Sequence, residues 1–226
     1  MVLARYNCDP EALIEAVRKF RRKRILVLGD LMLDRFIWGS VNRISPEAPV
    51  PVVEILRETS CLGGAANVAA NISSLGGLPI PIGVLGNDPE GKLLADKFRV
   101  IGASVRGLVV DRERATSVKT RIIAHHQQVC RTDREDRAPL SAPTQALIVA
   151  RFRALMPAAD AVIVSDYAKG LISPSLVKSI LPMAKSAGKI VCVDPKLKNL
   201  AAYSPASVIT PNALEAERAS GITITS

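Results

Sequence analysis

The sequence predicts an α/β protein built on a doubly wound, mostly parallel β-sheet. Short apolar runs rich in β-branched residues, such as RILVLGD at Arg24–Asp30, alternate with amphipathic stretches of helical length. The runs are apolar throughout, which is typical of strands that are buried on both faces of a parallel sheet. They also end repeatedly in Asp, Asn or Gly, the residues expected where strands lead into loops and helix caps.

The first expected element is an amphipathic helix in the segment DPEALIEAVRKF. Asp9 suits the N-cap and Pro10 the first helical position, while Leu13, Val17 and Phe20 share one face. The dense basic run RKFRRKR overlaps its end, and a solvated helix end accounts for that run.

The remaining elements of the main sheet follow in alternation. After the strand at Arg24–Asp30, strands are expected at Ile80–Gly86, Asp160–Asp166, Lys189–Pro195 and Ala206–Asn212. Helices are expected at about Ala65–Leu75, Asp88–Ile101, Ala142–Leu155, Pro174–Ala187 and Ala213–Ser220. This order predicts helices on both faces of the sheet.

Two β-rich stretches break the alternation. VPVVEILRETS (Val50–Ser60) and SVKTRIIAHHQQVCRTD (Ser117–Asp133) have no helix between their halves, so we expect antiparallel strands that form a small lid. Together with the residues before the first stretch, the lid strands span about 36–60 and 117–133. Because no linker or internal repeat divides the chain, residues 1–226 are expected to form a single domain with this lid.

Composition narrows the class of function. With 48% hydrophobic and 23% charged residues, and with no apolar run near the roughly 18 to 20 residues of a membrane span, we expect a cytoplasmic protein without membrane contact. The four cysteines, Cys8, Cys61, Cys130 and Cys192, are scattered and expected to be reduced thiols. The net charge of +9 comes with only 4% aromatic residues, which favours an anionic small substrate over nucleic acid.

Polar residues gather where the predicted strands end. Ligands of open parallel sheets bind outside the carboxyl ends of the strands, where loops and helix N-termini converge. Asp88 is explained as a helix N-cap, but the whole set exceeds what capping requires. The set consists of Gly29, Asp30, Asp34, Gly86, Asn87, Asp88, Asp166, Tyr167, Lys169, Gly170, Asp194, Lys196, Asn212 and Glu215.

A glycine pair precedes one of the predicted helices. In CLGGAANVAANISSLGG, Gly63 and Gly64 allow close approach of a ligand to the backbone, and the helix that follows offers free N–H groups. Asn67 lies in the first turn of that helix. The pair alone is equally consistent with close packing.

Several motifs, in this order and spacing, resemble the ribokinase-like (PfkB) carbohydrate kinases. They are GDLMLDRFIWGSVNRISPEAPVPVVEI, GGAANVAANISSLGG, KTRIIAHHQQVCRTD, VSDYAKGLISPSLV, VDPK and TPNALE, and the resemblance runs from about Arg24 to about Ser220. RISPEAPVPV and DYAKG are the most specific. Within the family they resemble the D-glycero-β-D-manno-heptose 7-phosphate kinases, which occur alone or as the kinase half of a bifunctional ADP-heptose synthesis enzyme.

The resemblance implies roles for individual residues on the sugar side. Asp34 occupies the position of the acid that holds sugar hydroxyls. Ala65 stands where many sugar kinases of the family have a lysine, as it does in heptose kinases. The implied substrate-binding residues are Asp34, Gly63, Gly64, Asn67, the lid residues Arg121, Gln128 and Arg131, and Asp166, Lys169 and Lys196, the two lysines meeting the sugar phosphate.

The resemblance also implies a nucleotide site. Asn212, Ala213, Leu214 and Glu215 match the family's N-x-x-E motif, which organises the phosphates of the metal–nucleotide complex. ATP and Mg²⁺ are therefore the implied cofactors, with Glu215 acting on the metal indirectly.

The family's catalytic base is an Asp in a G-A-G-D motif, and this motif is absent from the 226 residues. We therefore expect the base beyond Ser226, the chain to be the N-terminal two-thirds of a kinase with the C-terminal third missing, and the fragment to be inactive by itself. Another sugar kinase of the family and a non-catalytic sugar-phosphate-binding protein remain alternatives. Because a shortened sheet exposes an edge and an apolar face, a homodimer is also expected.

Overall fold

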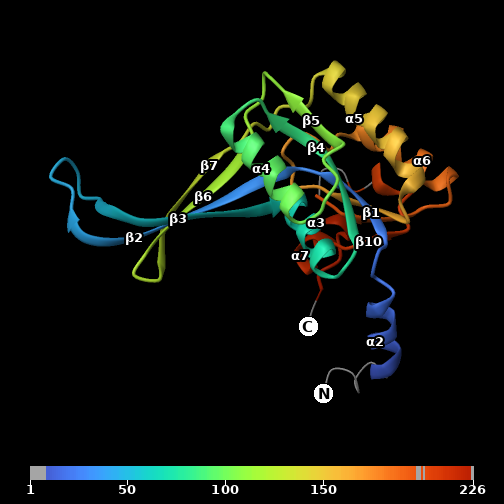
Figure 1. The fold of residues 1–226 in the computed structure, drawn as a ribbon, viewed down its shortest axis with the longest axis horizontal. Coiled ribbons are helices and arrows are strands. Elements are labelled where there is room, and N and C mark those ends of the chain that lie inside the picture. Colours follow the sequence, from blue (N-terminus) through green and yellow to red (C-terminus); the bar gives the residue numbers. More distant parts are fainter. Residues whose placement is uncertain (1–8, 197–199, 201, 225–226) are drawn as a thin grey trace.

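The computed structural model describes residues 9–196, 200 and 202–224, and its centre is a six-stranded parallel sheet (Figure 1). The strand order is β10-β9-β8-β1-β4-β5, and every described pair is parallel. This confirms the doubly wound α/β fold. The strands are β1 (Arg24–Gly29), β4 (Leu78–Gly86), β5 (Gly107–Asp111), β8 (Ala161–Ser165), β9 (Ile190–Asp194) and β10 (Val208–Ile209).

Helices cover the sheet unequally on its two faces. On one face α5 and α6 pack over the sheet, with Ile148, Phe152 and Ile180 fully buried among strand residues. On the other face α3 and α4 cover β1 and β4, while Val208 and Ile209 of β10 stay exposed. The helices are α3 (Ala65–Ser74), α4 (Pro89–Val100), α5 (Ala142–Leu155), α6 (Pro174–Ser186) and α7 (Ala213–Ser220), with a short 3-10 helix, η1 (Met156–Ala158).

Local capping explains where several of these helices begin. Ser141 and Ser173 cap α5 and α6 through their hydroxyls, and each helix has Pro in its first two positions, Pro143 in α5 and Pro174 in α6. Asp88 caps α4 by accepting the N–H of Gly91 at 2.7 Å, as the sequence predicted. Its second oxygen accepts the N–H of Thr116 at 2.8 Å, so the same carboxylate also ties α4 to the segment before β6.

The second sheet is small, mixed and projects from the carboxyl end of β1 (Figure 1). Its order is β3-β2-β6-β7. The outer pairs β2–β3 and β6–β7 are antiparallel, but the central pair β2–β6 is parallel, where the sequence led us to expect antiparallel strands throughout. The strands are β2 (Leu31–Ile44), β3 (Pro51–Gly64), β6 (Ser117–Ala124) and β7 (Gln127–Arg134).

The N-terminal helix α2 (Pro10–Arg18) forms as predicted but packs differently from a core helix. Asp9 caps it by accepting the N–H of Glu11 at 3.0 Å. Its apolar residues Leu13, Val17 and the following Phe20 are 43 to 50% exposed, and Figure 1 shows α2 standing away from the sheet. The amphipathic pattern therefore predicted the helix correctly, but the apolar face of the helix is exposed. Cys8 lies outside the described residues.

The chain changes direction at β1, and this positions the candidate site. From β1 it proceeds through the small sheet and α3 to β4 and β5 on one side, and then crosses to β8, β9 and β10 on the other. Gly29, Ser165 and Asp194 are in register at the carboxyl ends of neighbouring strands. Ligands of open α/β sheets bind at such a switch point, here between β1 and β8. Of the helices in the described ranges, none combines the length and apolar character needed to cross a lipid bilayer.

Candidate functional site

Asp34 is held on β2 at the base of the small sheet. Its Oδ1 accepts a hydrogen bond from Arg121 of β6 at 2.7 Å, and the two side chains are 20% and 25% exposed. Gly63 of β3 lies against the same carboxylate, because a Cβ built there would be 2.5 Å from Asp34 Oδ2. Three strands thus bring a carboxylate, a cation and a glycine together, an arrangement suited to holding a polar ligand.

Aromatic and basic side chains continue this face of the small sheet. The rings of Phe36 and Trp38 stack with their centroids 6.1 Å apart and at 20° to each other. The guanidinium of Arg121 lies 5.2 Å from the Phe36 centroid, and that of Arg57 lies 5.1 Å from the Trp38 centroid. Trp38 donates to Thr59 Oγ1 at 3.1 Å. The Arg121 guanidinium is therefore held by two contacts: the Phe36 ring lies against its face, and Asp34 accepts a hydrogen bond from it.

Two further lid residues expected to contact substrate lie on β7. Arg131 is opposite Arg121 in the sheet and forms an ion pair with Asp133, at 2.9 Å from its Nε. Asp133 also lies 3.6 Å from Lys119. Gln128 is exposed near the β6–β7 turn, opposite Ile123. Arg131 thus lies beside the Asp34–Arg121 pair, and Gln128 lies farther along the lid.

The glycine pair ends β3 and starts α3. Gly64 has φ +56°, a conformation that favours glycine, and it is the N-cap of α3. Asn67 is exposed in the first turn and lines a groove of about 340 Å³ between α3, α4 and β3. Lys97 of α4 donates to the carbonyl of Ser60 at 2.7 Å in this groove. It therefore fastens α4 to the edge strand of the lid. In the sequence, this lysine is one of several charged residues on a helix and does not stand out from them.

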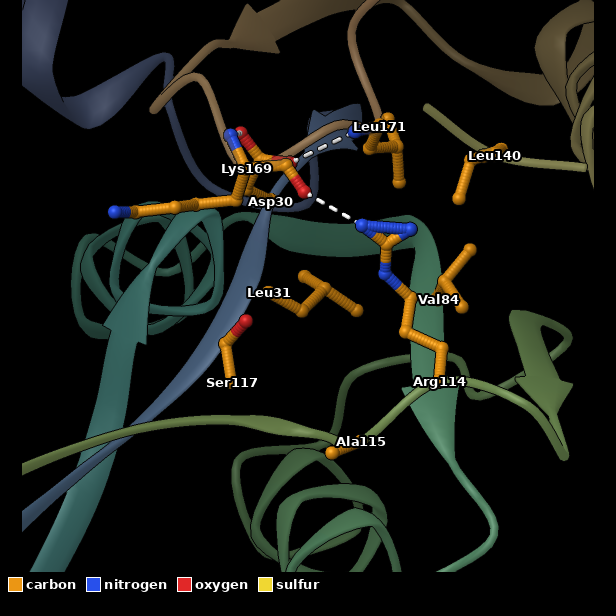
Figure 2. Close-up of a pocket in the computed structure, with 9 residues that line it drawn as sticks. All are labelled: Asp30, Leu31, Val84, Arg114, Ala115, Ser117, Leu140, Lys169 and Leu171. Atoms are coloured by element: carbon orange, nitrogen blue, oxygen red, sulfur yellow. Dashed lines mark hydrogen bonds between the residues drawn. The ribbon is translucent and has the colours of Figure 1, made fainter. Parts of the chain in front are cut away.

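Asp30 lies directly after β1 and organises the loop after β8 (Figure 2). It is 4% exposed, and its carboxylate accepts the N–H groups of Tyr167, Lys169 and Leu171 at 2.9, 3.1 and 3.2 Å. Burial raises the pKa of Asp30, and the neighbouring charge of Asp166 adds to the rise, while the three backbone donors lower it. Asp30 thus faces the protein interior and supports the DYAKG loop.

Lys169 is partly buried and paired. Its ammonium lies 2.6 Å from Glu135, and the two side chains are 12% and 9% exposed. Burial opposes ionisation of Glu135, but hydrogen bonds from Lys169 and Arg137 outweigh it and lower the pKa of Glu135. The lysine expected to meet a sugar phosphate is therefore held by a carboxylate of the segment after β7.

Asp166 is buried at the carboxyl end of β8. It is 1% exposed and accepts hydrogen bonds from the Tyr203 hydroxyl at 2.6 Å and the Ala168 N–H at 2.7 Å. This burial favours a supporting role for Asp166, whereas the sequence placed it among substrate contacts.

A second group of charges surrounds the start of α7. Asn212 and Glu215 form a capping box: Glu215 N–H donates to Asn212 Oδ1 at 2.9 Å, and Asn212 N–H donates to Glu215 Oε2 at 3.0 Å. The other oxygen of Glu215 accepts from Lys196 at 3.2 Å, and the Asn212 N–H is the largest cause of its lowered pKa. Burial and then the Glu215 charge raise the pKa of Asp194. Ala213 and Leu214 are exposed in the first turn.

The predicted residues therefore fall into two groups of contacts. One lies on the small sheet around Asp34, and the other follows the carboxyl ends of the strands from Asp30 to Glu215. Within the described ranges, no group of three or more His, Cys, Asp and Glu side chains is placed to hold a metal ion directly. Oxygen donors at the start of α7 are the type that Mg²⁺ accepts through water.

This arrangement of a parallel sheet and a projecting lid has relatives among solved structures. Phosphofructokinase-2 from Escherichia coli, in complex with substrates and products, superposes with a TM-score of 0.71 and 19% identity, covering 91% of this chain and 65% of that chain. Ribokinase of Arabidopsis thaliana, complexed with ribose and ATP, gives a TM-score of 0.65 and 16% identity, with 91% and 65% covered. The protein therefore has a ribokinase-like fold.

The sequence identifies the family. The profile described as pfkB family carbohydrate kinase matches residues 22–226, and the chain belongs to this family. The bifunctional protein HldE of Caulobacter vibrioides is 46% identical over 216 residues, which are 96% of this chain and 44% of that protein. The HldE protein of Wolinella succinogenes is 44% identical over 203 residues, 90% and 43% of the two chains. The chain thus spans less than half the length of these relatives.

Sequence reasoning missed several residues that shape the site. Arg114 and Glu135 belong to no recognisable motif. Both contact Lys169, which is distant in the sequence, so no local pattern reveals their roles. Lys97 looked like one of several helix-surface cations. The sequence feature around Glu135 is the mixed-charge run DREDR, and such runs are usually solvated, so it does not single out Glu135.

Proposed function

We propose that the chain carries the sugar-binding part of a kinase that phosphorylates the C1 hydroxyl of D-glycero-β-D-manno-heptose 7-phosphate to give the 1,7-bisphosphate. The observation that carries the proposal is the HldE-like sequence, with 46% identity over 96% of the chain, together with RISPEAPVPV and DYAKG. The product would serve ADP-heptose and lipopolysaccharide core biosynthesis in the cytoplasm.

In this proposal the two groups of side chains hold the two ends of the sugar phosphate. Asp34 accepts hydrogen bonds from sugar hydroxyls, and Arg121, Arg131 and Gln128 close over the sugar from the lid. Gly63, Gly64 and Asn67 supply the substrate-side glycine motif at the start of α3. Lys169 and Lys196 attract the phosphate, since each offers a point charge to an anion.

The nucleotide is ATP with Mg²⁺. The backbone N–H groups of Ala213 and Leu214 lie in the exposed first turn of α7, near the ordered carboxylate of Glu215, so these donors fit a metal–nucleotide complex. When bound, Mg²⁺ supplies positive charge at the phosphoryl oxygens. Glu215 organises it indirectly, and its other carboxylate oxygen holds Lys196 at 3.2 Å.

The proposed chain binds substrate without turning it over. No G-A-G-D motif occurs in the 226 residues, so no residue is assigned the role of base. Two alternatives remain: a PfkB kinase acting on another sugar, and a non-catalytic sugar-phosphate-binding protein. A binding preference for ribose or fructose phosphate over the heptose phosphate would favour the first, and sugar-phosphate binding without any nucleotide affinity the second.

We also propose self-association as a homodimer. Val208 and Ile209 are 49% and 42% exposed on the last strand of the main sheet, and Ile190 of β9 is 59% exposed. An uncovered apolar strand at a sheet edge favours pairing with another chain. Analytical ultracentrifugation tests this, and a monodisperse monomer with a cooperative melt would contradict it.

Two measurements on this chain test the main proposal. Calorimetric titration with the heptose 7-phosphate should show binding, and Asp34→Asn should weaken it while Asp96→Asn, on the exposed face of α4, should not. A coupled ADP-release assay with ATP and Mg²⁺ should show no turnover. Turnover at an ordinary kinase rate, on the order of 1 to 100 per second, would show that the chain contains its own base.

A further inference from the structure

The loop after β8 is wrapped around a buried carboxylate. Asp30 accepts three backbone N–H groups from Tyr167, Lys169 and Leu171, at 2.9 to 3.2 Å, across nearly 140 residues of sequence. Because residues 167, 169 and 171 all donate to one carboxylate, the backbone N–H groups of these alternate residues face Asp30. The residues between them are therefore directed away from Asp30.

Arg114 holds the same loop from the other side. It precedes β6, its side chain is 12% exposed, and its Nη2 donates to the carbonyl of Lys169 at 3.0 Å (Figure 2). The same guanidinium donates to the carbonyls of Asp136 at 2.8 Å and Ala138 at 2.7 Å. One planar group thus joins the DYAKG loop to the segment after β7, which a lysine with a single ammonium cannot do in the same way.

The loop needs these external contacts because its backbone is strained. Ala168 has φ +53°, a left-handed conformation that is disfavoured for a residue with a Cβ. Gly170 has φ +90°, and a Cβ there would collide with the carbonyl of Ala138 and with Arg114. Such conformations persist only where the surroundings enforce them. Asp166 supplies one such contact by accepting the Ala168 N–H, and Asp30 and Arg114 hold the residues on either side.

The segment held by Arg114 also carries the partner of Lys169. Glu135 stands immediately before Asp136, and its carboxylate lies 2.6 Å from the Lys169 ammonium. The position of this ammonium is therefore set at both ends: the loop determines where the side chain starts, and Glu135 determines where it ends. Both ends are tied to Arg114.

We propose that Asp30 and Arg114 are positioning residues that fix the ammonium of Lys169 where it receives the anionic group of the substrate. This inference rests on the proposed function for the identity of that anion, a sugar phosphate. Neither residue touches the ligand. Asp30 is buried against the loop, and Arg114 uses its donors on backbone carbonyls, beside a small pocket of about 20 Å³ that Asp30, Arg114, Ser117 and Lys169 line with apolar neighbours (Figure 2).

The first test compares heptose 7-phosphate with unphosphorylated heptose by calorimetric titration of the full chain. The ratio of the two affinities isolates the contribution of the phosphate. Lys169→Met should lower this ratio about 10- to 100-fold, the range for a charge-assisted hydrogen bond. Arg114→Lys should produce most of the same loss but no further loss in the Lys169→Met background, because the two act through one contact. Arg106→Lys, an exposed arginine, is the matched control and should change nothing.

The second test needs no ligand. Amide hydrogen exchange should become faster at Tyr167, Lys169 and Leu171 in Arg114→Lys, while the amides of β4 keep their wild-type protection. Asp30→Asn should have the larger effect on the same three amides, because an amide side chain replaces the charged acceptor. If Asp30→Asn does not fold, Arg114→Lys decides alone.

The outcomes separate the two proposals. Suppose that Lys169→Met lowers the ratio of the affinities for phosphorylated and unphosphorylated heptose, but Arg114→Lys leaves this ratio unchanged. The proposed function would then stand, and the inference would be overturned. If the wild-type chain binds both sugars equally, the proposed function fails, and with it the assignment of an anion to Lys169. Hydrogen exchange then decides whether Asp30 and Arg114 hold the Lys169 loop: faster exchange confined to the loop supports this part of the inference, and unchanged exchange overturns it.

Discussion

Gly63→Ala should move the Asp34 carboxylate without unfolding the protein. A Cβ at position 63 would lie 2.5 Å from Asp34 Oδ2 and 2.8 Å from Asp34 Cγ, closer than such atoms normally approach. The obstructing atoms are the end of a side chain, so rotation of the carboxylate relieves the clash. That rotation gives up the 2.7 Å contact with Arg121.

The expected loss of stability is small and the expected loss of binding is large. An added methyl in a packed position costs about 1 to 3 kcal/mol, and we expect the lower end because Asp34 and Arg121 are 20 to 25% exposed and can rearrange. Misplacing a charged acceptor of sugar hydroxyls should weaken sugar-phosphate binding about 10- to 100-fold. Urea denaturation measures the first effect and calorimetric titration the second.

Gly102→Ala is the control. Its φ is +71° but no heavy atom lies within 4 Å of a Cβ there, so it tests backbone strain without a clash and should cost about 1 kcal/mol of stability without changing affinity. The reasoning is refuted if Gly63→Ala binds the sugar phosphate as tightly as the wild type. Asp34 would then not be the acceptor, or its position would not limit binding.

Three further outcomes follow from the geometry. Phe152→Ala, at a fully buried site of α5, should lower the unfolding free energy by about 3 to 5 kcal/mol in urea denaturation, and a loss under 1 kcal/mol would contradict the packing described. The pKa of Glu90 is lowered chiefly by its hydrogen bond from Arg134, so its stabilising contribution is present above its unfolded pKa of 4.5 and is lost as the pH falls through its folded pKa. Denaturation at descending pH should therefore show a smaller loss of stability for Glu90→Gln than for the wild type; an identical profile would exclude this contribution. Glu215→Gln should weaken Mg²⁺–ATP binding and spare sugar-phosphate binding in calorimetry, and equal losses of both would contradict separate sites.

Much of the fold follows from short-range patterns in the sequence. The N-caps Asp9, Asp88 and Asn212 lie where their carboxylate or amide oxygens accept N–H groups two or three residues ahead, so a few neighbouring residues decide where these helices start. The buried strands β1 and β8 have continuous apolar runs, ILVL and AVIV, which indicate a parallel sheet. The strand β5 escaped prediction because its GLVVD run is only five residues long and begins with glycine, which is rare inside strands.

The parallel pairing of β2 with β6 did not follow from the sequence. Periodicity identifies a β-strand but not its neighbour, because the ladder joins backbone groups that every residue carries. The parallel register of β2 with β6, in which Phe36 is opposite Arg121, joins segments more than 80 residues apart. That register, and no local motif, brings Arg121 within reach of Asp34.

By itself the sequence determined the alternation of strands and helices, the caps, and the motifs that place the chain among carbohydrate kinases. Only the tertiary structure decided which charges meet: Asp34 with Arg121, Lys169 with Glu135, and Asp30 with the loop it supports. It also left the apolar face of α2 exposed, against the expectation from its pattern. The physical reason is range, because local structure depends on residues a few positions apart, whereas the site depends on packing that joins residues distant in the chain.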